Sequence, residues 1–325
     1  MPAERSVNEV SVAASARLHL GFLDLHGGLG RKFGGLGLAI DGPKTRLTLT
    51  HAEATSVEGP EAERAASLLE KAQSALAPGL KTRLVIHEAI PAHAGLGSGT
   101  QLALAIAAAL RRLADVAGDA ASDAAATGRG ARSGLGAGLF EHGGFVVDGG
   151  RREDGWTAPV VARLPFPPEW RVLLVSDPRA EGAHGEGERE AFARLPAFSE
   201  ATAGELCRRV LMQALPALIE GDLVGFGAAI EHIQLAVGDY FAPAQGGGRF
   251  LSPVVERTVA ALIAEGAVGG GQTSWGPTGF AFAASEAEAE RIASRVRPLD
   301  AGLSVEVFRA QDRGAKIDAV YARLA

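Results

Sequence analysis

Residues 90–101 read Ile-Pro-Ala-His-Ala-Gly-Leu-Gly-Ser-Gly-Thr-Gln, and a long run of alanine and leucine follows them directly. The three glycines, Gly95, Gly97 and Gly99, allow tight turns and a close approach of the backbone to a ligand. Their N–H groups, together with the first free N–H groups of the next helix, form an anion site. Residues 83–87 alternate in the manner of a strand. The order of strand, glycine loop and helix therefore predicts a phosphorylated substrate.

The spacing of this loop excludes two common nucleotide motifs. A Walker loop needs Gly-x-x-x-x-Gly-Lys-Ser/Thr, and the segment contains no lysine. A dinucleotide fingerprint needs Gly-x-Gly-x-x-Gly, and the third glycine is missing. The remaining alternative is an ordinary glycine-rich turn without a ligand.

Three more clusters combine glycines with polar side chains, over residues 15–37, 128–144 and 270–279. Four such clusters favour one shared site, because glycine-dense segments bring the backbone close to a ligand. The candidate residues outside the loop are Arg17, His19, Asp24, Arg31, Arg129, Arg132, Ser133, Glu141, His142, Gln272, Thr273, Ser274 and Trp275. For each residue alone a structural role stays open: a surface ion pair between Arg17 and Asp24, a solvated loop around Arg129, or a core position for Trp275.

The whole chain has the size and charge of a globular enzyme without a nucleic-acid surface. Its 325 residues suffice for two domains, which we place at residues 1–167 and 168–325. The net charge of −6 and the absence of basic runs argue against nucleic acid as a partner. The chain starts without a secretory signal, and its alanine-rich stretch is too short for a membrane span. Cys207, the single cysteine, cannot form an internal disulfide and is expected to be buried. These features predict a cytoplasmic location.

Local patterns predict alternating strands and helices. We expect strands at 9–20, 36–41, 45–51, 82–88, 171–176, 278–284 and 303–309, and helices at 61–76, 99–116, 203–235, 252–265 and 285–297. Asp41-Gly42-Pro43 is expected to form a turn between two of the strands. Ser122 or Asp123 is expected to cap a short helix.

Two segments together resemble motifs of the GHMP kinase superfamily. They are Ala14-Ser15-Ala16-Arg17-Leu18-His19-Leu20-Gly21 and Pro91-x-x-x-Gly95-Leu96-Gly97-Ser98-Gly99, and residues 269–280 look like the superfamily's third motif. The resemblance implies an α+β fold of two domains. The N-terminal domain would carry a left-handed βαβ crossover, and the C-terminal domain would be ferredoxin-like. The sequence departs from the kinases at Gly99-Thr100-Gln101, where Ser-Ala-Ala is the kinase pattern.

Longer segments are similar to one branch, the β-ribofuranosylaminobenzene 5′-phosphate synthase family. The most distinctive are Arg132-Ser133-Gly134-Leu135-Gly136 and Phe140-Glu141-His142-Gly143-Gly144-Phe145. The resemblance implies a pentosyltransferase of tetrahydromethanopterin synthesis that joins 4-aminobenzoate to phosphoribosyl pyrophosphate, with loss of CO₂ and pyrophosphate. It further implies a homodimer, Mg²⁺ bound with the donor, and no ATP.

The same resemblance suggests roles for the candidate residues. A phosphate or pyrophosphate would lie on Gly95, Leu96, Gly97, Ser98, Gly99, Thr100 and Gln101. Arg17, Arg31, Arg129 and Arg132 would hold the other anionic groups, and Asp24 or Glu141 would face the ribose C1 or Mg²⁺. Two other functions stay open. One is a small-molecule kinase that binds ATP at the same loop, and the other is an inactive member that binds a metabolite or a partner.

Overall fold

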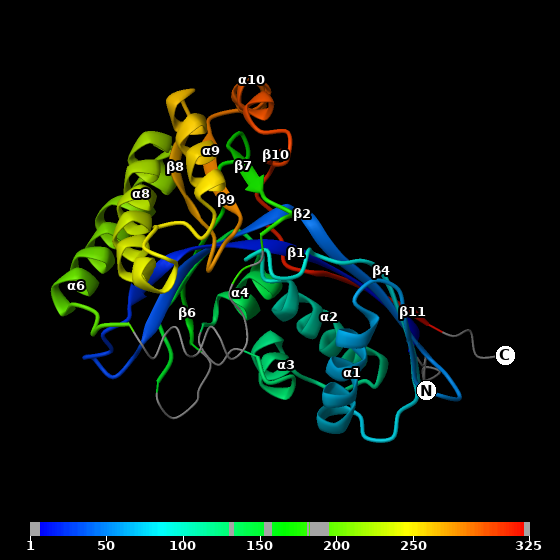
Figure 1. Ribbon diagram of the computed structural model, residues 1–325. Coiled ribbons are helices and arrows are strands. Elements are labelled where there is room, and N and C mark those ends of the chain that lie inside the picture. The colour runs from blue at the N-terminus through cyan, green and yellow to red at the C-terminus, as the bar shows by residue number, and fades with distance from the viewer. Residues whose placement is uncertain (1–6, 130–132, 153–157, 181, 183–194, 322–325) are drawn as a thin grey trace.

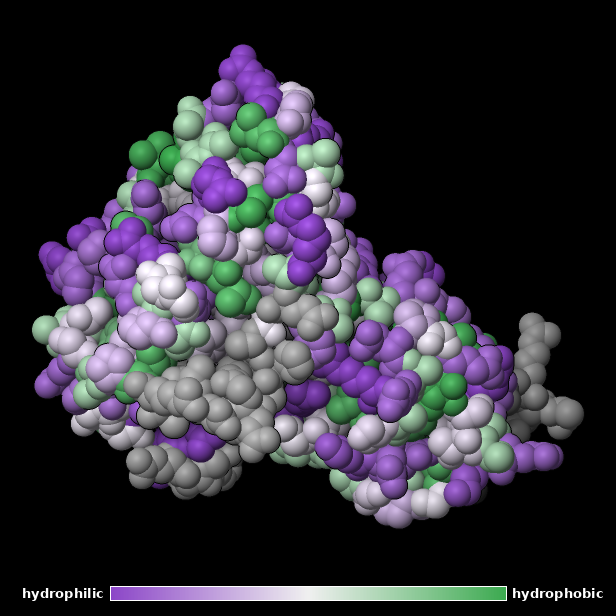
Figure 2. All heavy atoms as spheres, viewed as in Figure 1, coloured by the Kyte–Doolittle hydropathy of each residue, from purple (hydrophilic) through white to green (hydrophobic). Residues whose placement is uncertain are grey.

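The computed structural model describes residues 7–129, 133–152, 158–180, 182 and 195–321 (Figure 1). Two β-sheets, each with helices packed on it, form two halves, and the long strands β1 and β2 of the first sheet also contact elements of the second half. On the face shown in Figure 2, hydrophobic residues are scattered among hydrophilic ones. This is the ordinary pattern of a globular surface.

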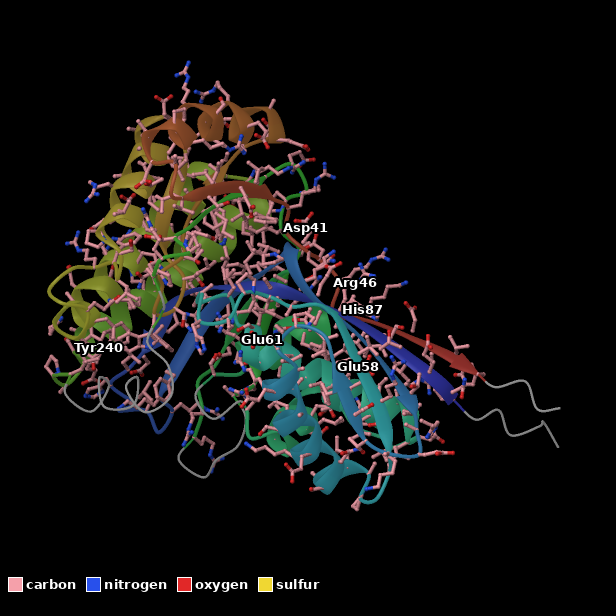
Figure 3. The ribbon with its side chains drawn as sticks, turned by 45° about the vertical axis from the view of Figure 1, so that its right-hand side comes forward. Asp41, Arg46, Glu58, Glu61, His87 and Tyr240 are labelled. Atoms are coloured by element: carbon pink, nitrogen blue, oxygen red, sulfur yellow. The ribbon has the colours of Figure 1, made fainter. Side chains whose placement is uncertain are left out.

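The first sheet has the order β11-β1-β2-β4-β3, and β5 and β6 continue it from the other end of β2. Its strands are β1 (Val7–Asp24), β2 (Phe33–His51), β3 (Ser56–Glu58), β4 (Thr82–Glu88), β5 (Phe145–Asp148), β6 (Val160–Leu164) and β11 (Lys316–Tyr321). Four helices lie beneath it in Figure 1, namely α1 (Ala62–Leu76), α2 (Ser98–Leu113), α3 (Ala120–Ala126) and α4 (Leu135–His142). Arg46 and His87 lie on the opposite, exposed face (Figure 3).

Helix α2 is the centre of this half, and its alanines explain its position. Every residue from Gln101 to Leu110 is buried. Small side chains allow a helix to lie close to the strands and helices around it, and α2 contacts β1, β2 and α1. The close packing fixes the start of α2, and therefore the glycine loop before it.

The second sheet has the strand order β10-β7-β9-β8, with all neighbours antiparallel. Its elements are β7 (Arg171–Ser176), α6 (Glu200–Arg209), the π-helix η1 (Val210–Ala214), α7 (Leu215–Glu220), α8 (Leu223–Phe241), the 3₁₀ turn η2 (Ala242–Ala244), α9 (Pro253–Ala264), β8 (Val268–Gln272), β9 (Gly279–Ala283), α10 (Glu286–Val296), the 3₁₀ turn η3 (Arg297–Leu299) and β10 (Ser304–Phe308). Along the chain these are one strand, helices, two strands, a helix and a last strand, and with the spatial order β10-β7-β9-β8 they make a ferredoxin-like unit. The predicted α+β fold is thus confirmed.

The structure corrects the expected turn at Asp41-Gly42-Pro43. Strand β2 continues from Phe33 to His51, and residues 40–43 bulge out, because Ala39 pairs with Arg17 while Lys44 pairs with Ser15. A bulge accommodates a proline within a strand, since no ladder hydrogen bond is needed there. Asp41 instead exchanges hydrogen bonds with Arg309 beyond β10, at the place where β2 reaches the second sheet (Figure 3).

The structure differs from the sequence analysis at three further places: Cys207, the cap of α3 and the strand β11. Cys207 is exposed, so the prediction of a buried side chain is wrong. The cap of α3 is Asp119, whose carboxylate accepts a hydrogen bond from the backbone N–H of Ser122. The Ser122 hydroxyl in turn accepts one from the backbone N–H of Asp119. The last strand, β11, was not expected, and it returns from the second half to pair with β1.

Candidate active site

A cavity of about 310 Å³ lies where the glycine loop meets both halves of the molecule. Its lining comes from β1, α1, the loop before α2, the start of α4 and the connection between β8 and β9. The sequence-predicted residues that line it are Arg17, His19, Gly95, Gly97, Ser98, Gly99, Thr100, Arg129, Ser133, Ser274 and Trp275. The structure thus brings all four glycine-rich clusters to one cavity.

The glycine loop is held by side chains from both halves. Gly95 (φ 75°) and Gly97 (φ 80°) adopt left-handed conformations, and Gly97 caps α2. The carbonyl of Gly95 accepts from an Arg17 guanidinium nitrogen at 3.0 Å and from the Thr273 hydroxyl at 3.0 Å. A Cβ on Gly97 would lie 2.9 Å from the Arg17 side chain. Glycine is therefore required here for its conformation and for space.

Two arginines meet above the first turn of α2. A Cβ built on Gly99 would lie 2.0 Å from a terminal nitrogen of Arg64 and 3.5 Å from one of Arg129. Arg64 has Glu61 as an ion-pair partner at 3.5 Å, at the start of α1 where Figure 3 labels Glu61. Burial, and then the nearby charge of Arg64, lower the pKa of Arg129. Guanidinium groups stay charged in proteins, so with Arg17 they make the cavity strongly cationic.

The sequence analysis missed Arg64, which lies inside an ordinary amphipathic helix. The signal that could have found it is Gly99. A glycine in the first turn of a helix lowers helix propensity, and here it leaves the room that the Arg64 guanidinium occupies.

His19 is a buried, neutral histidine at the base of the cavity. Its Nδ1 accepts from the backbone N–H of Gly21 at 3.3 Å, which leaves the proton on Nε2. Nε2 is buried without a hydrogen-bond partner among the described residues. Burial, and then the charge of Arg17, lower the pKa of His19 to about 3. His19 therefore adds no charge to the cavity near neutral pH.

Asp148 at the end of β5 positions the start of α4 beside the cavity. Its carboxylate accepts from the Ser133 hydroxyl at 2.7 Å, the Gly134 N–H at 3.1 Å and the Gly150 N–H at 2.9 Å. Burial raises the pKa of this carboxyl group. The sequence analysis did not select Asp148. Its contacts indicate a structural role, because its acceptor sites are used within the protein.

Several predicted residues support the site without lining the cavity. Leu96 is buried, and its carbonyl accepts from the Arg17 backbone N–H. Gln101 donates to the Gly136 carbonyl at 3.1 Å and so ties α2 to α4. The Thr273 hydroxyl accepts from the His19 N–H at 2.9 Å while it donates to Gly95.

Other predicted residues lie outside the cavity lining. Asp24 accepts from the backbone N–H groups of His26 and Gly27 and so stabilises the turn after β1. Arg31 is exposed and donates to the Gly150 carbonyl. Glu141 and His142 are exposed at the end of α4. The geometry offers no support for a catalytic role of Glu141 or His142. Arg132 lies outside the described residues.

A narrow recess of about 20 Å³ opens beside the main cavity, and Gln272 lies in it. We call this space the recess. Its lining consists of His19, Gly21, Phe22, Gln234, Val237, Gly238, Phe241, Gln245, Arg249, Gln272, Ser274 and Trp275. Four of these residues, His19, Phe22, Ser274 and Trp275, line the main cavity as well. The recess and the main cavity are therefore adjacent.

Within the described ranges, no three His, Cys, Asp or Glu residues gather in a way that could hold a metal ion. The described helices include none that is both long and apolar enough to cross a membrane.

Comparison with known proteins places the chain among relatives of similar length. Family models described as "GHMP kinases N terminal domain" and "GHMP kinases C terminal" match residues 61–143 and 214–298. A curated protein of Archaeoglobus fulgidus named "Beta-ribofuranosylphenol 5'-phosphate synthase" is 34% identical over 67% of this chain and 73% of its own length. A protein of the same name from Methanothermobacter thermautotrophicus is 29% identical over 95% of this chain and 98% of its own.

Solved structures agree on the fold. A homoserine kinase from Cytophaga hutchinsonii superposes with a TM-score of 0.65 over 96% of this chain and 98% of its own, at 17% identity. At this identity the similarity concerns the fold alone.

Proposed function

The chain belongs to the beta-ribofuranosylphenol 5′-phosphate synthase family and is an enzyme of this type, and from this membership we propose that it condenses 4-aminobenzoate with phosphoribosyl pyrophosphate. The products are CO₂, pyrophosphate and 4-(β-D-ribofuranosyl)aminobenzene 5′-phosphate. One observation carries the proposal. The start of α2 and the guanidinium groups of Arg17, Arg64 and Arg129 line one cavity, which suits a donor with two phosphorylated groups.

The reaction needs stabilisation of the leaving group more than it needs a base. The bond between the ribose C1 and the pyrophosphate oxygen breaks, and its electron pair leaves with pyrophosphate. The arginines and the α2 N–H groups stabilise that developing charge. The ring carbon that carries the carboxylate then bonds to C1. Loss of CO₂ returns the electron pair of the broken carbon–carbon bond to the ring, so no proton has to be removed.

The positive charge of the cavity suits the stabilisation of a pyrophosphate leaving group. Arg129 has no carboxylate ion-pair partner within the described part of the chain, and Glu61 is the partner of Arg64. Among the described residues, the positive charge of Arg64 and Arg129 is therefore only partly compensated. A multiply charged anion supplies the missing negative charge, whereas an uncharged ligand leaves the arginines to repel one another.

Further parts of the proposal concern cofactors and assembly. Mg²⁺ would reach the site bound to the donor's pyrophosphate, and ATP is not expected to take part. We propose a cytoplasmic homodimer that acts in tetrahydromethanopterin biosynthesis. A second acceptor, 4-hydroxybenzoate, is favoured by one observation: the relatives' name contains a ribofuranosylphenol. The para hydroxyl of that acceptor activates the same ring carbon.

The test is an assay of the purified full-length protein with phosphoribosyl pyrophosphate, Mg²⁺ and carboxyl-labelled 4-aminobenzoate or 4-hydroxybenzoate. We expect CO₂ and pyrophosphate in equal amounts from one of the acceptors. A parallel reaction with ATP, followed for ADP, tests the kinase alternative. ADP formation without CO₂ release would support the kinase, and the absence of both would support an inactive binder.

A further inference from the structure

We infer that the recess holds the para substituent of the aromatic acceptor and selects the acceptor by the size of that group. This inference rests on the proposed function. In the reaction, the ring carbon that attacks the ribose must face the main cavity, where the phosphates of the donor bind. The para substituent lies on the opposite side of the ring and must therefore point away from the main cavity. The recess adjoins that cavity, and four residues line both.

The size of the recess limits what it can accept. Its volume is about 20 Å³, against about 310 Å³ for the main cavity. A space of roughly 10–15 Å³ on this measure holds one water molecule. An amino or hydroxyl group, with a single heavy atom, is of that size. The aromatic ring itself is far larger, so the ring must lie at the mouth of the recess, on the main-cavity side.

Aromatic side chains surround that mouth. The ring centroids of Phe22 and Phe241 are 6.0 Å apart, and those of Phe241 and Trp275 are 4.7 Å apart. His19 lies 4.4 Å from Phe22. Centroid distances of this size place the rings in contact with one another. A benzoate ring at the mouth would join this cluster by edge or face contacts.

Neutral amide groups line the recess together with Arg249, whose guanidinium forms an ion pair with Asp239. The side-chain oxygen of Gln272 accepts from the Leu251 N–H at 2.7 Å, and that of Gln234 accepts from the Gln272 N–H at 2.8 Å. Each of these two oxygens accepts one bond from a described donor, and an amide oxygen has two lone pairs. Both can therefore accept a further N–H or O–H. Among the described lining residues none is acidic.

This arrangement can favour the transition state over the bound acceptor. When the ring carbon attacks the ribose, the para nitrogen or oxygen donates its lone pair into the ring and becomes positively charged. Its N–H or O–H then becomes a stronger donor, so its hydrogen bonds to the oxygens of Gln234 and Gln272 strengthen. An interaction that is stronger in the transition state than in the ground state increases kcat.

The first experiment compares acceptors with the wild-type protein. 4-(Methylamino)benzoate and 4-(dimethylamino)benzoate activate the ring at least as well as 4-aminobenzoate, but their para groups are larger. We expect kcat/KM to fall by tenfold to 200-fold, roughly the effect of one methyl group in a tight pocket. Equal kcat/KM for the three acceptors would overturn the inference. Failure with every acceptor would instead refute the proposed function, and the inference with it.

The second experiment enlarges the recess. Val237 lines it from α8, and Val237→Ala should raise the ratio of kcat/KM for 4-(methylamino)benzoate to that for 4-aminobenzoate by about tenfold. The matched control is Val224→Ala, on the same helix but 70% exposed and outside both linings. It should leave the ratio unchanged. An unchanged ratio in a folded Val237→Ala protein would overturn the inference. If that variant does not fold, the comparison of the three acceptors with the wild-type protein still tests the inference.

Discussion

Replacement of Gly99 by alanine should raise stability and lower activity at the same time. Gly99 lies in the first turn of α2 without a left-handed backbone, so alanine fits the helix. A glycine-to-alanine change inside a helix stabilises it by about 0.5–1 kcal/mol. The new Cβ would, however, lie 2.0 Å from a terminal nitrogen of Arg64. This nitrogen is the far end of a flexible side chain, so the guanidinium moves and the backbone does not.

The size of that movement gives the expected kinetic effect. Ordinary van der Waals contact begins at 3.4 Å, so the guanidinium must retreat by about 1.4 Å, from 2.0 Å to 3.4 Å. A hydrogen bond does not survive such a displacement. A charge-assisted bond to an anionic donor substrate contributes about 1.5–3 kcal/mol. Its loss should raise the KM for phosphoribosyl pyrophosphate by about tenfold to 150-fold.

The assay combines steady-state kinetics with thermal unfolding. Gly99→Ala should have a Tm about 2 °C higher than wild type. The matched control is Gly204→Ala in α6, where no heavy atom lies within 4 Å of the new Cβ, and it should gain stability without a change in KM. Arg64→Ala combined with Gly99→Ala should be no worse than Arg64→Ala alone. An unchanged KM in Gly99→Ala would remove Arg64 from the donor site, and a lower Tm would show that the backbone has to move.

The other predictions concern pH, the support of the site and the residues outside the cavity. Because the pKa of His19 is about 3 in the folded protein and 6.5 as a free side chain, the unfolded state binds an extra proton below about pH 6.5. Stability should thus fall by about 2 kcal/mol between pH 7.5 and pH 5, and urea unfolding of His19→Asn should lack this loss. Asp148→Ala leaves three donors unpaired and should cost about 3 kcal/mol of unfolding free energy, measured by urea unfolding. Glu141→Gln and His142→Gln should each change kcat/KM by less than about twofold, and a large fall would restore their predicted catalytic role. Arg132→Ala should slow turnover by orders of magnitude if Arg132 binds developing charge, and unchanged kinetics would remove it from the site.

The glycine loop could be predicted because its signal is local. The order of strand, three alternate glycines and helix occupies one continuous segment, and the free N–H groups at the start of a helix are suited to binding an anion. The four glycine-rich clusters were also expected to share one site, and their segments do meet at the cavity. These inferences needed only the chemistry of short segments.

The features that escaped prediction depend on contacts between distant segments. Arg64 belongs to the site because α1 packs against α2 and the Arg64 guanidinium lies beside the one position of α2 without a side chain, Gly99. The Asp41-Gly42-Pro43 sequence has every local sign of a turn, yet partner strands on both sides keep β2 extended through it. Asp24, which was expected to face the ribose or Mg²⁺, uses its carboxylate on the turn that follows it. For Arg64 and for Asp41-Gly42-Pro43, tertiary structure overrides the local pattern, whereas the carboxylate of Asp24 is used by a local turn.

The two halves of the molecule contribute different chemistry to the site, and Thr273 connects the two contributions. The first half supplies the cations and the start of α2, and the second half supplies the amides of the recess. The Thr273 hydroxyl accepts from the His19 N–H at 2.9 Å and donates to the Gly95 carbonyl at 3.0 Å. A hydroxyl group can do both, and Thr273 has no exposed surface. Since Gly95 belongs to the anion loop and His19 lines the recess, this side chain, together with the bond from Arg17 to the Gly95 carbonyl, helps to fix the distance between the donor and acceptor parts of the site. A reaction between two substrates requires such a fixed distance, because a displacement of about 1 Å can cost a hundredfold in rate.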